Sequence, residues 1–108
     1  MRVAVRGWAA SSLEIHSEED WTDDAPEVEA ACSAFRRGLR RCLVFSLSEA
    51  DAVVDGLTTL SNTEDERAED RAERRRDPEG TRYARLSAGG LSELSVRVCR
   101  AIGTARTT

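Results

Sequence analysis

Histidine is the side chain that most often activates a catalytic serine or cysteine, and the chain has only one, His16. His16 lies in the N-terminal region, outside the segments that show helical periodicity. A Ser-His or Cys-His pair would therefore require this region to fold back onto the rest of the chain. We interpret His16 as a surface residue and expect no catalytic residues, which makes a small enzyme the least favoured class of function.

The three cysteines are spaced too widely for a structural zinc site. Such sites place thiolate or imidazole ligands a few residues apart, whereas Cys32 and Cys42 are ten residues apart and Cys99 is remote from both. Cys32 and Cys42 fall on the apolar side of a predicted helix, and we interpret them as small buried hydrophobic residues. Cys99 falls off the apolar arc of the last predicted helix, so we expect an exposed thiol there. The sequence therefore predicts no metal and no cofactor.

Carboxylates are numerous, but they lie in runs such as residues 18–20 and 64–66, which are typical of a solvated surface. General acid–base catalysis needs two carboxyl groups held at a fixed separation in a pocket. The glycine pair Gly89-Gly90 is not followed by the Lys-Ser or Lys-Thr of a phosphate-binding loop. Neither pattern therefore predicts a catalytic site.

All sixteen basic residues are arginine, which is typical of a GC-rich coding sequence and is not in itself a sign of function. One group lies on the polar face of a predicted helix and comprises Arg36, Arg37, Arg40 and Arg41. A second group comprises residues 74–76, 82 and 85. Two such groups facing the same way would span several phosphates, so nucleic-acid binding is the alternative hypothesis. A solvated face opposite an apolar core is the simpler interpretation, because the net charge is −4 and no aromatic or Asn side chain is interleaved to contact bases.

Three segments place their apolar residues on one side of a helix, at about 25–43, 48–61 and 79–102. Asp24 with Pro26 favours the start of the first, and Ser48 is the predicted N-cap of the second. Asp77 before Pro78 predicts a turn or a cap ahead of the third, whose phase continues through Gly89-Gly90 to a predicted C-cap at Gly103. An alternating strand over residues 94–99 is the competing interpretation.

Short connections between helices favour antiparallel neighbours, so the predicted fold is all-α, a small three-helix or possible four-helix bundle. Residues 24–103 form the predicted helical domain. Within it, residues 62–78 are either a solvated helix capped by Thr63 or a flexible charged linker. Residues 104–108 are predicted to be a frayed tail.

Residues 1–23 are predicted to be a weakly structured leader. The alternation in residues 2–6 and 13–16 would also fit a short β-hairpin, which is marginally stable on its own. The leader contains Trp8 and Trp21, which either dock it onto the helices or stay exposed for a partner.

Three cysteines cannot all pair within one chain, and the N-terminus lacks the continuous apolar stretch of a secretory signal. The longest apolar run, residues 42–45, is far too short to cross a bilayer. We therefore expect a cytoplasmic protein with free thiols and no membrane contact. Helices with leucine and valine seams and acid-rich turns are shared by many small bacterial proteins.

The core is thin, since Leu, Ile, Val and Phe together make up 21 of the 108 residues. The last predicted helix has an apolar arc of about 160°, which is wider than the arc of about 120° on the helix over 48–61. An apolar stripe left uncovered commonly marks an interface. We therefore predict a non-catalytic protein–protein interaction module, a small regulator or accessory subunit that forms a homodimer or binds a larger partner. The candidate interface comprises Tyr83, Leu86, Leu91, Leu94, Val98 and Ile102.

Overall fold

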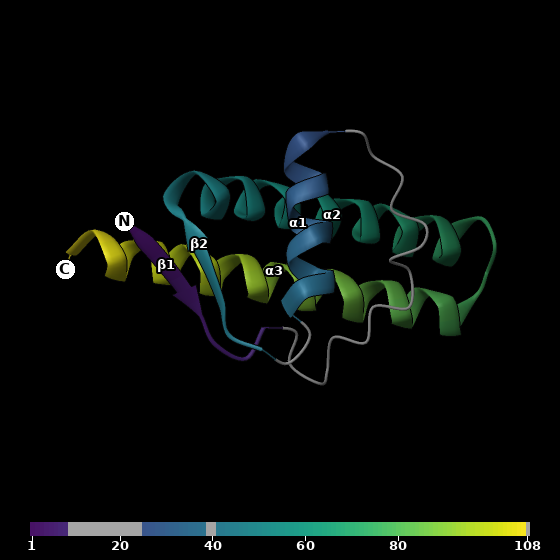
Figure 1. Cartoon of the computed structure of the whole chain (residues 1–108). Helices are drawn as coiled ribbons and strands as arrows, with labels where there is room; N and C mark the ends of the chain where they lie inside the picture. The colour runs from purple at the N-terminus through teal and green to yellow at the C-terminus, as the bar shows by residue number, and fades with distance from the viewer. Residues whose placement is uncertain (9–24, 39–40, 108) are drawn as a thin grey trace.

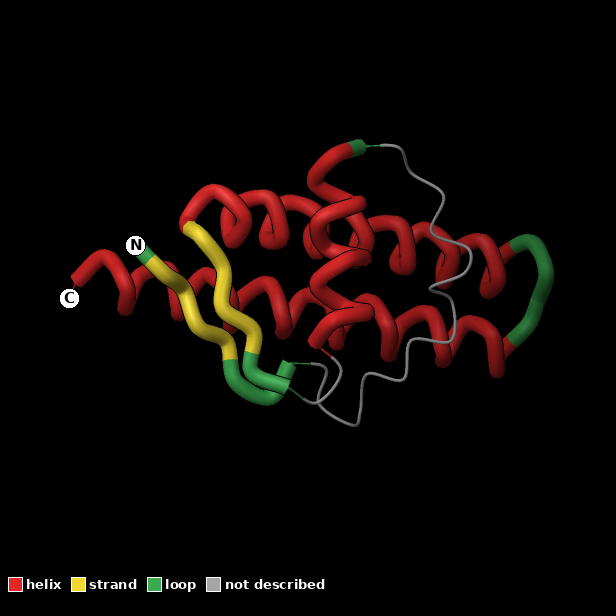
Figure 2. Tube along the Cα trace, viewed as in Figure 1, coloured by secondary structure: helices red, strands yellow, loops and turns green. Residues whose placement is uncertain are grey.

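The computed structural model describes residues 1–8, 25–38 and 41–107, and three packed helices dominate this part of the chain. The elements in chain order are β1 (Arg2–Val5), α1 (Pro26–Gly38), β2 (Leu43–Ser46), α2 (Leu47–Glu73) and α3 (Pro78–Thr107). Figure 1 shows α2 and α3 side by side as an antiparallel pair, with α1 lying across α2. The strands pair alongside the C-terminal half of α3, as Figure 2 shows in yellow. The prediction of a small three-helix fold is confirmed.

Helix α1 is shorter than the predicted segment 25–43, because it ends at Gly38. Gly38 is buried, and a Cβ there would collide with the ring of Trp8. Helix α1 also crosses α2 closely at Gly56 of α2. A Cβ there would collide with the backbone carbonyl of Glu27 in α1. The predicted cap Asp24 lies outside the described residues. The apolar positions that suggested a longer helix belong in part to β2.

The two strands form an antiparallel sheet in which Val3 faces Phe45 and Ala4 faces Val44. Alternation along β1 buries Val3 and Val5 and leaves Arg2 and Ala4 exposed, as expected for a strand with one covered face. The predicted hairpin partner, residues 13–16, lies outside the described residues, and β1 pairs instead with β2, about forty residues further along the chain. The sheet thus depends on a long-range contact.

The first eight residues contribute directly to the core. Trp8 is fully buried and meets Phe45 edge to face, with the ring centroids 5.8 Å apart. Its backbone N–H donates to the carbonyl of Arg41 over 3.1 Å. Arg97 of α3 holds the same segment, since its guanidinium donates to the carbonyl of Gly7 at 3.1 Å and to that of Arg6. The prediction that Trp8 docks the leader onto the helices is therefore right, whereas Trp21 lies outside the described residues.

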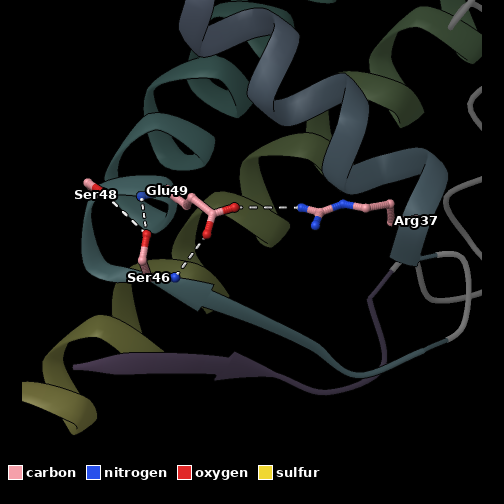
Figure 3. Close-up of polar contacts among 4 residues, drawn as sticks. All are labelled: Arg37, Ser46, Ser48 and Glu49. Atoms are coloured by element: carbon pink, nitrogen blue, oxygen red, sulfur yellow. Dashed lines mark hydrogen bonds and ion pairs between the residues drawn. The ribbon is translucent and has the colours of Figure 1, made fainter.

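Helix α2 begins at Leu47, one residue before the predicted segment, and its N-cap is Ser46 and not Ser48. Figure 3 shows the two reciprocal bonds of a capping box. The Glu49 backbone N–H donates to the Ser46 hydroxyl, and the Ser46 backbone N–H donates to the Glu49 carboxylate, each over 3.2 Å. In the sequence, the capping-box spacing S-x-x-E from Ser46 to Glu49 indicates this N-cap.

Alanine substitutions distinguish Ser46 from Ser48 as the N-cap of α2. We expect Ser46→Ala to lower the free energy of unfolding by about 1 kcal/mol, because a first-turn N–H loses its acceptor. Ser48→Ala is the matched control and is expected to change it by less than about 0.5 kcal/mol. Urea titration followed by far-UV circular dichroism measures both. Equal losses, or a larger loss for Ser48→Ala, would contradict the assignment of the cap.

Helix α2 continues to Glu73 and takes in most of the predicted connecting segment 62–78. Thr63 does not start a new helix, because its hydroxyl donates to the Thr59 carbonyl four residues back, over 3.0 Å. The continuation is also not fully solvated. Glu64 and Ala68 are buried, and Glu64 has an ion pair with Arg67 at 3.3 Å. Both predictions for this segment, a flexible linker and a fully solvated helix, are therefore wrong, because up to Glu73 it is a partly buried continuation of α2.

Helix α3 is one continuous helix from Pro78, with Asp77 as its cap. The Asp77 carboxylate accepts a bond from the Gly80 backbone N–H at 3.0 Å, which is the second of the two predicted alternatives, a cap ahead of Pro78. The preceding Arg76 has φ 46°, a left-handed conformation that turns the chain back. The helix passes through Gly89-Gly90 and Gly103 and extends to Thr107, so the predicted cap at Gly103 and the strand over 94–99 are wrong. The frayed tail over residues 104–108 stays a prediction.

Candidate interaction surface

The six residues of the predicted interface divide into two groups. Leu91, Leu94 and Val98 are fully buried, and Ile102 is 8% exposed, so all four belong to the core of the single chain. The wide arc of α3 is covered because the sheet adds to what α2 covers, and β1 packs directly on α3. Tyr83 and Leu86, which are 48% and 57% exposed, are the two that remain on the surface.

The side of α3 that points away from the core carries a second regular pattern. We call it the outer face of α3, and it comprises Arg82, Leu86, Gly89, Glu93, Val96, Arg100, Gly103 and Thr107, all exposed. Successive members are alternately four and three residues apart, which is the spacing that keeps side chains in line along a helix paired with another helix. Two members, Leu86 and Val96, are large apolar residues that are 57% and 46% exposed.

The glycines of this face leave it open. A Cβ built on Gly89 or on Gly103 would meet no atom within 4 Å. Glycine also costs on the order of 1 kcal/mol relative to alanine inside a helix. At both positions the backbone is bare, so another helix has room to approach closely.

The charges of the outer face are not used within the described part of the chain. Neither Glu93 nor Arg100 has an ion pair or a hydrogen bond there, whereas Arg97, one position to the side, is taken up by the carbonyls of Gly7 and Arg6. Arginines outnumber acidic residues along α3, and the reverse holds along α2. The sequence analysis missed Glu93, Val96 and Arg100 because it followed only apolar periodicity.

The first predicted arginine group does not form one helix stripe. Because α1 ends at Gly38, Arg41 lies beyond the helix, and Arg40 lies outside the described residues. Arg36 and Arg37 are exposed at the end of α1. Figure 3 shows Arg37 reaching the Glu49 carboxylate at 4.0 Å, and its guanidinium also lies 6.0 Å from the Phe45 ring centroid. Arg37 therefore links α1 to the start of α2.

The second predicted arginine group lies around the turn between α2 and α3. Arg74 and Arg75 both pair with Asp70, at 3.7 and 3.5 Å. Arg76 and Arg85 line a cavity of about 390 Å³, and the acidic residue Asp77 lines it as well. The turn therefore carries a mixed charge pattern, in which acidic groups offset much of the basic charge.

The cysteines are divided between core and surface. Cys32 is buried, as predicted, and Cys99 is exposed, as predicted. Cys42 is exposed, against the prediction, because it lies beyond the end of α1. Cys99 borders a cavity of about 430 Å³ together with Asp51 and Asp55. Across the described ranges, no three His, Cys, Asp or Glu residues converge in a way that would hold a metal ion. The predicted surface histidine, His16, lies outside those ranges.

Two further findings bear on the class of protein. None of the helices in the described part of the chain has the length and apolar character needed to span a membrane. Comparison with protein-family models, with curated proteins and with solved structures finds no match for this chain.

Proposed function

We propose that the protein is a non-catalytic interaction module, a small regulator or accessory subunit, which binds a protein partner through the outer face of α3. The observation that supports this most is the exposure of Leu86 and Val96 on one face of a helix whose opposite face lies in the core. Apolar residues with charged neighbours are typical of the centre and rim of a protein–protein interface.

The elements that pack against the inner side of α3 also favour binding. Helix α3 packs along α2, and its C-terminal half is covered by the sheet as well. A surface carried on one continuous, supported helix loses little conformational entropy when a partner binds. The face is thus prepared for a partner helix without rearrangement of the core.

Site-specific photo-crosslinking in cells of the native host tests the proposal. A photoreactive residue at Leu86 or at Val96 is expected to give a discrete protein adduct. The matched control places the photoreactive residue at Asp65, which is exposed on α2. This position is expected to give no adduct. Mass spectrometry of the adducts identifies the partner and the contacted residue.

Two outcomes would count against this function. The first is no adduct from either α3 position in a protein that retains its helical circular dichroism. The second is the same pattern of adducts from Asp65 as from the outer face, because the contact would then not be specific to α3.

A further inference from the structure

The outer face of α3 is complementary to itself when it is turned end for end. Val96 lies at the centre, with Gly89 seven residues before it and Gly103 seven residues after it. Glu93 and Arg100 flank Val96 on opposite sides, and they bear opposite charges. A two-fold axis near Val96 therefore brings Glu93 of each copy alongside Arg100 of the other, and Gly89 alongside Gly103.

We propose that the partner is a second copy of this chain, bound by antiparallel pairing of the two α3 helices about Val96. The inference rests on the proposed function, because it names the partner of the same surface. A two-fold interface uses one patch twice, so each favourable contact occurs twice. Here the repeated contacts are two ion pairs and two glycine approaches, and the contact between the two Val96 side chains lies on the axis and occurs once.

The charges favour this pairing over the nearest alternatives. Parallel pairing in register would place Glu93 against Glu93 and Arg100 against Arg100. Moving the two-fold axis by one helical turn toward the N-terminus would place the two Glu93 carboxylates together. Like charges in contact are unfavourable and select against such arrangements. The unpaired state of Glu93 and Arg100 within the described part of a single chain leaves both available for the second copy.

The glycines set how closely the two helices approach. The ridge of side chains on one helix normally holds the partner axis at about 8–10 Å. With bare backbone at Gly89 and Gly103, the lower end of this range is accessible, and Val96 is covered at the centre. Leu86 then lies alongside Thr107 of the second copy, where it loses much of its exposure to water.

Charge exchange between two variants tests the inference on the full chain under reducing conditions. Light scattering at tens of micromolar is expected to show a dimer for the unaltered protein. E93R and R100E should each weaken dimerisation about tenfold or more, because both ion pairs become repulsive. An equimolar mixture of the two variants should restore a dimer, and native mass spectrometry should show one chain of each kind in it.

Matched controls carry the same charge changes away from the outer face. D55R on α2 and R41E, just before β2, alter exposed residues and are expected to leave the dimer intact. Far-UV circular dichroism checks that all four variants remain folded, which the exposure of the altered side chains favours.

The outcomes distinguish the second copy from the broader function. A monomer at tens of micromolar, or a dimer unaffected by both E93R and R100E, overturns the inference. If that monomer still gives a crosslink from Leu86 to a different protein, the interaction function stands and only the identity of the partner is wrong. If it gives no crosslink at all, both proposals fail.

Discussion

Trp8→Ala is expected to lower the free energy of unfolding by about 3–5 kcal/mol, the usual cost of removing a large buried aromatic ring. Trp8 has no exposed surface, and it packs against Phe45 and the backbone at Gly38. This loss is a large part of the total stability of a domain of this size. Urea titration with circular dichroism measures it.

Two further substitutions define what the ring contributes. Arg6→Ala changes an exposed side chain two residues away and is expected to cost less than about 0.5 kcal/mol. Trp8→Phe keeps an aromatic ring and removes the indole Nε1–H, which is buried with no hydrogen-bond partner in the described part of the chain, so its cost should be smaller than that of alanine. A loss below about 1 kcal/mol for Trp8→Ala would show that residues 1–8 are not part of the core.

Leu94→Ala and Leu86→Ala should differ sharply, although both leucines belong to the interface predicted from the sequence. Leu94 is fully buried and Leu86 is 57% exposed on the same helix. Removing the side chain of Leu94 is expected to cost about 2–5 kcal/mol through the lost apolar contacts and the cavity left behind. For Leu86→Ala we expect a change below about 0.5 kcal/mol in the stability of the single chain.

Chemical denaturation at low protein concentration separates this comparison from self-association. Similar losses for both leucines would contradict the division of α3 into a core face and an outer face. A charged substitution at Leu94, such as Leu94→Glu, would be a poor test of dimerisation for the same reason. A buried carboxylate without a partner unfolds the chain, and a monomer produced in this way says nothing about the interface.

The sequence predicted the helices well where the apolar pattern was long. Helix α3 was predicted over about 79–102 as one continuous helix, because the periodicity runs over more than six turns and survives Gly89-Gly90, whereas Asp77 was left as either a turn or a cap. The end of α1 was missed, because Cys42 and Leu43 continue the helical phase of the residues before them. The helix ends at Gly38, which lies against Trp8, and this contact joins residues thirty positions apart.

The candidate surface was harder to predict than the helices. Periodicity shows which side of α3 is apolar, but it does not show how many elements cover that side. The second cover is a sheet whose strands have four residues each and whose partners lie far apart in the sequence. The outer face was missed for a different reason. Its members are apolar, charged and glycine residues, so it has no apolar periodicity and is recognised only from the spacing and the charges of its members.

The bond from Arg97 to the carbonyl of Gly7 joins residues ninety positions apart. During translation, therefore, β1 leaves the ribosome long before the helix that supports it has been made. Closing such a long loop is slow compared with forming local helices. Until α3 emerges, Val3 and Val5 of β1 lack the helix that packs on their strand, so they are open to chaperones and to unwanted association. Residues 2–5 are therefore among the first to be synthesised, yet they complete their packing only after α3 has been made.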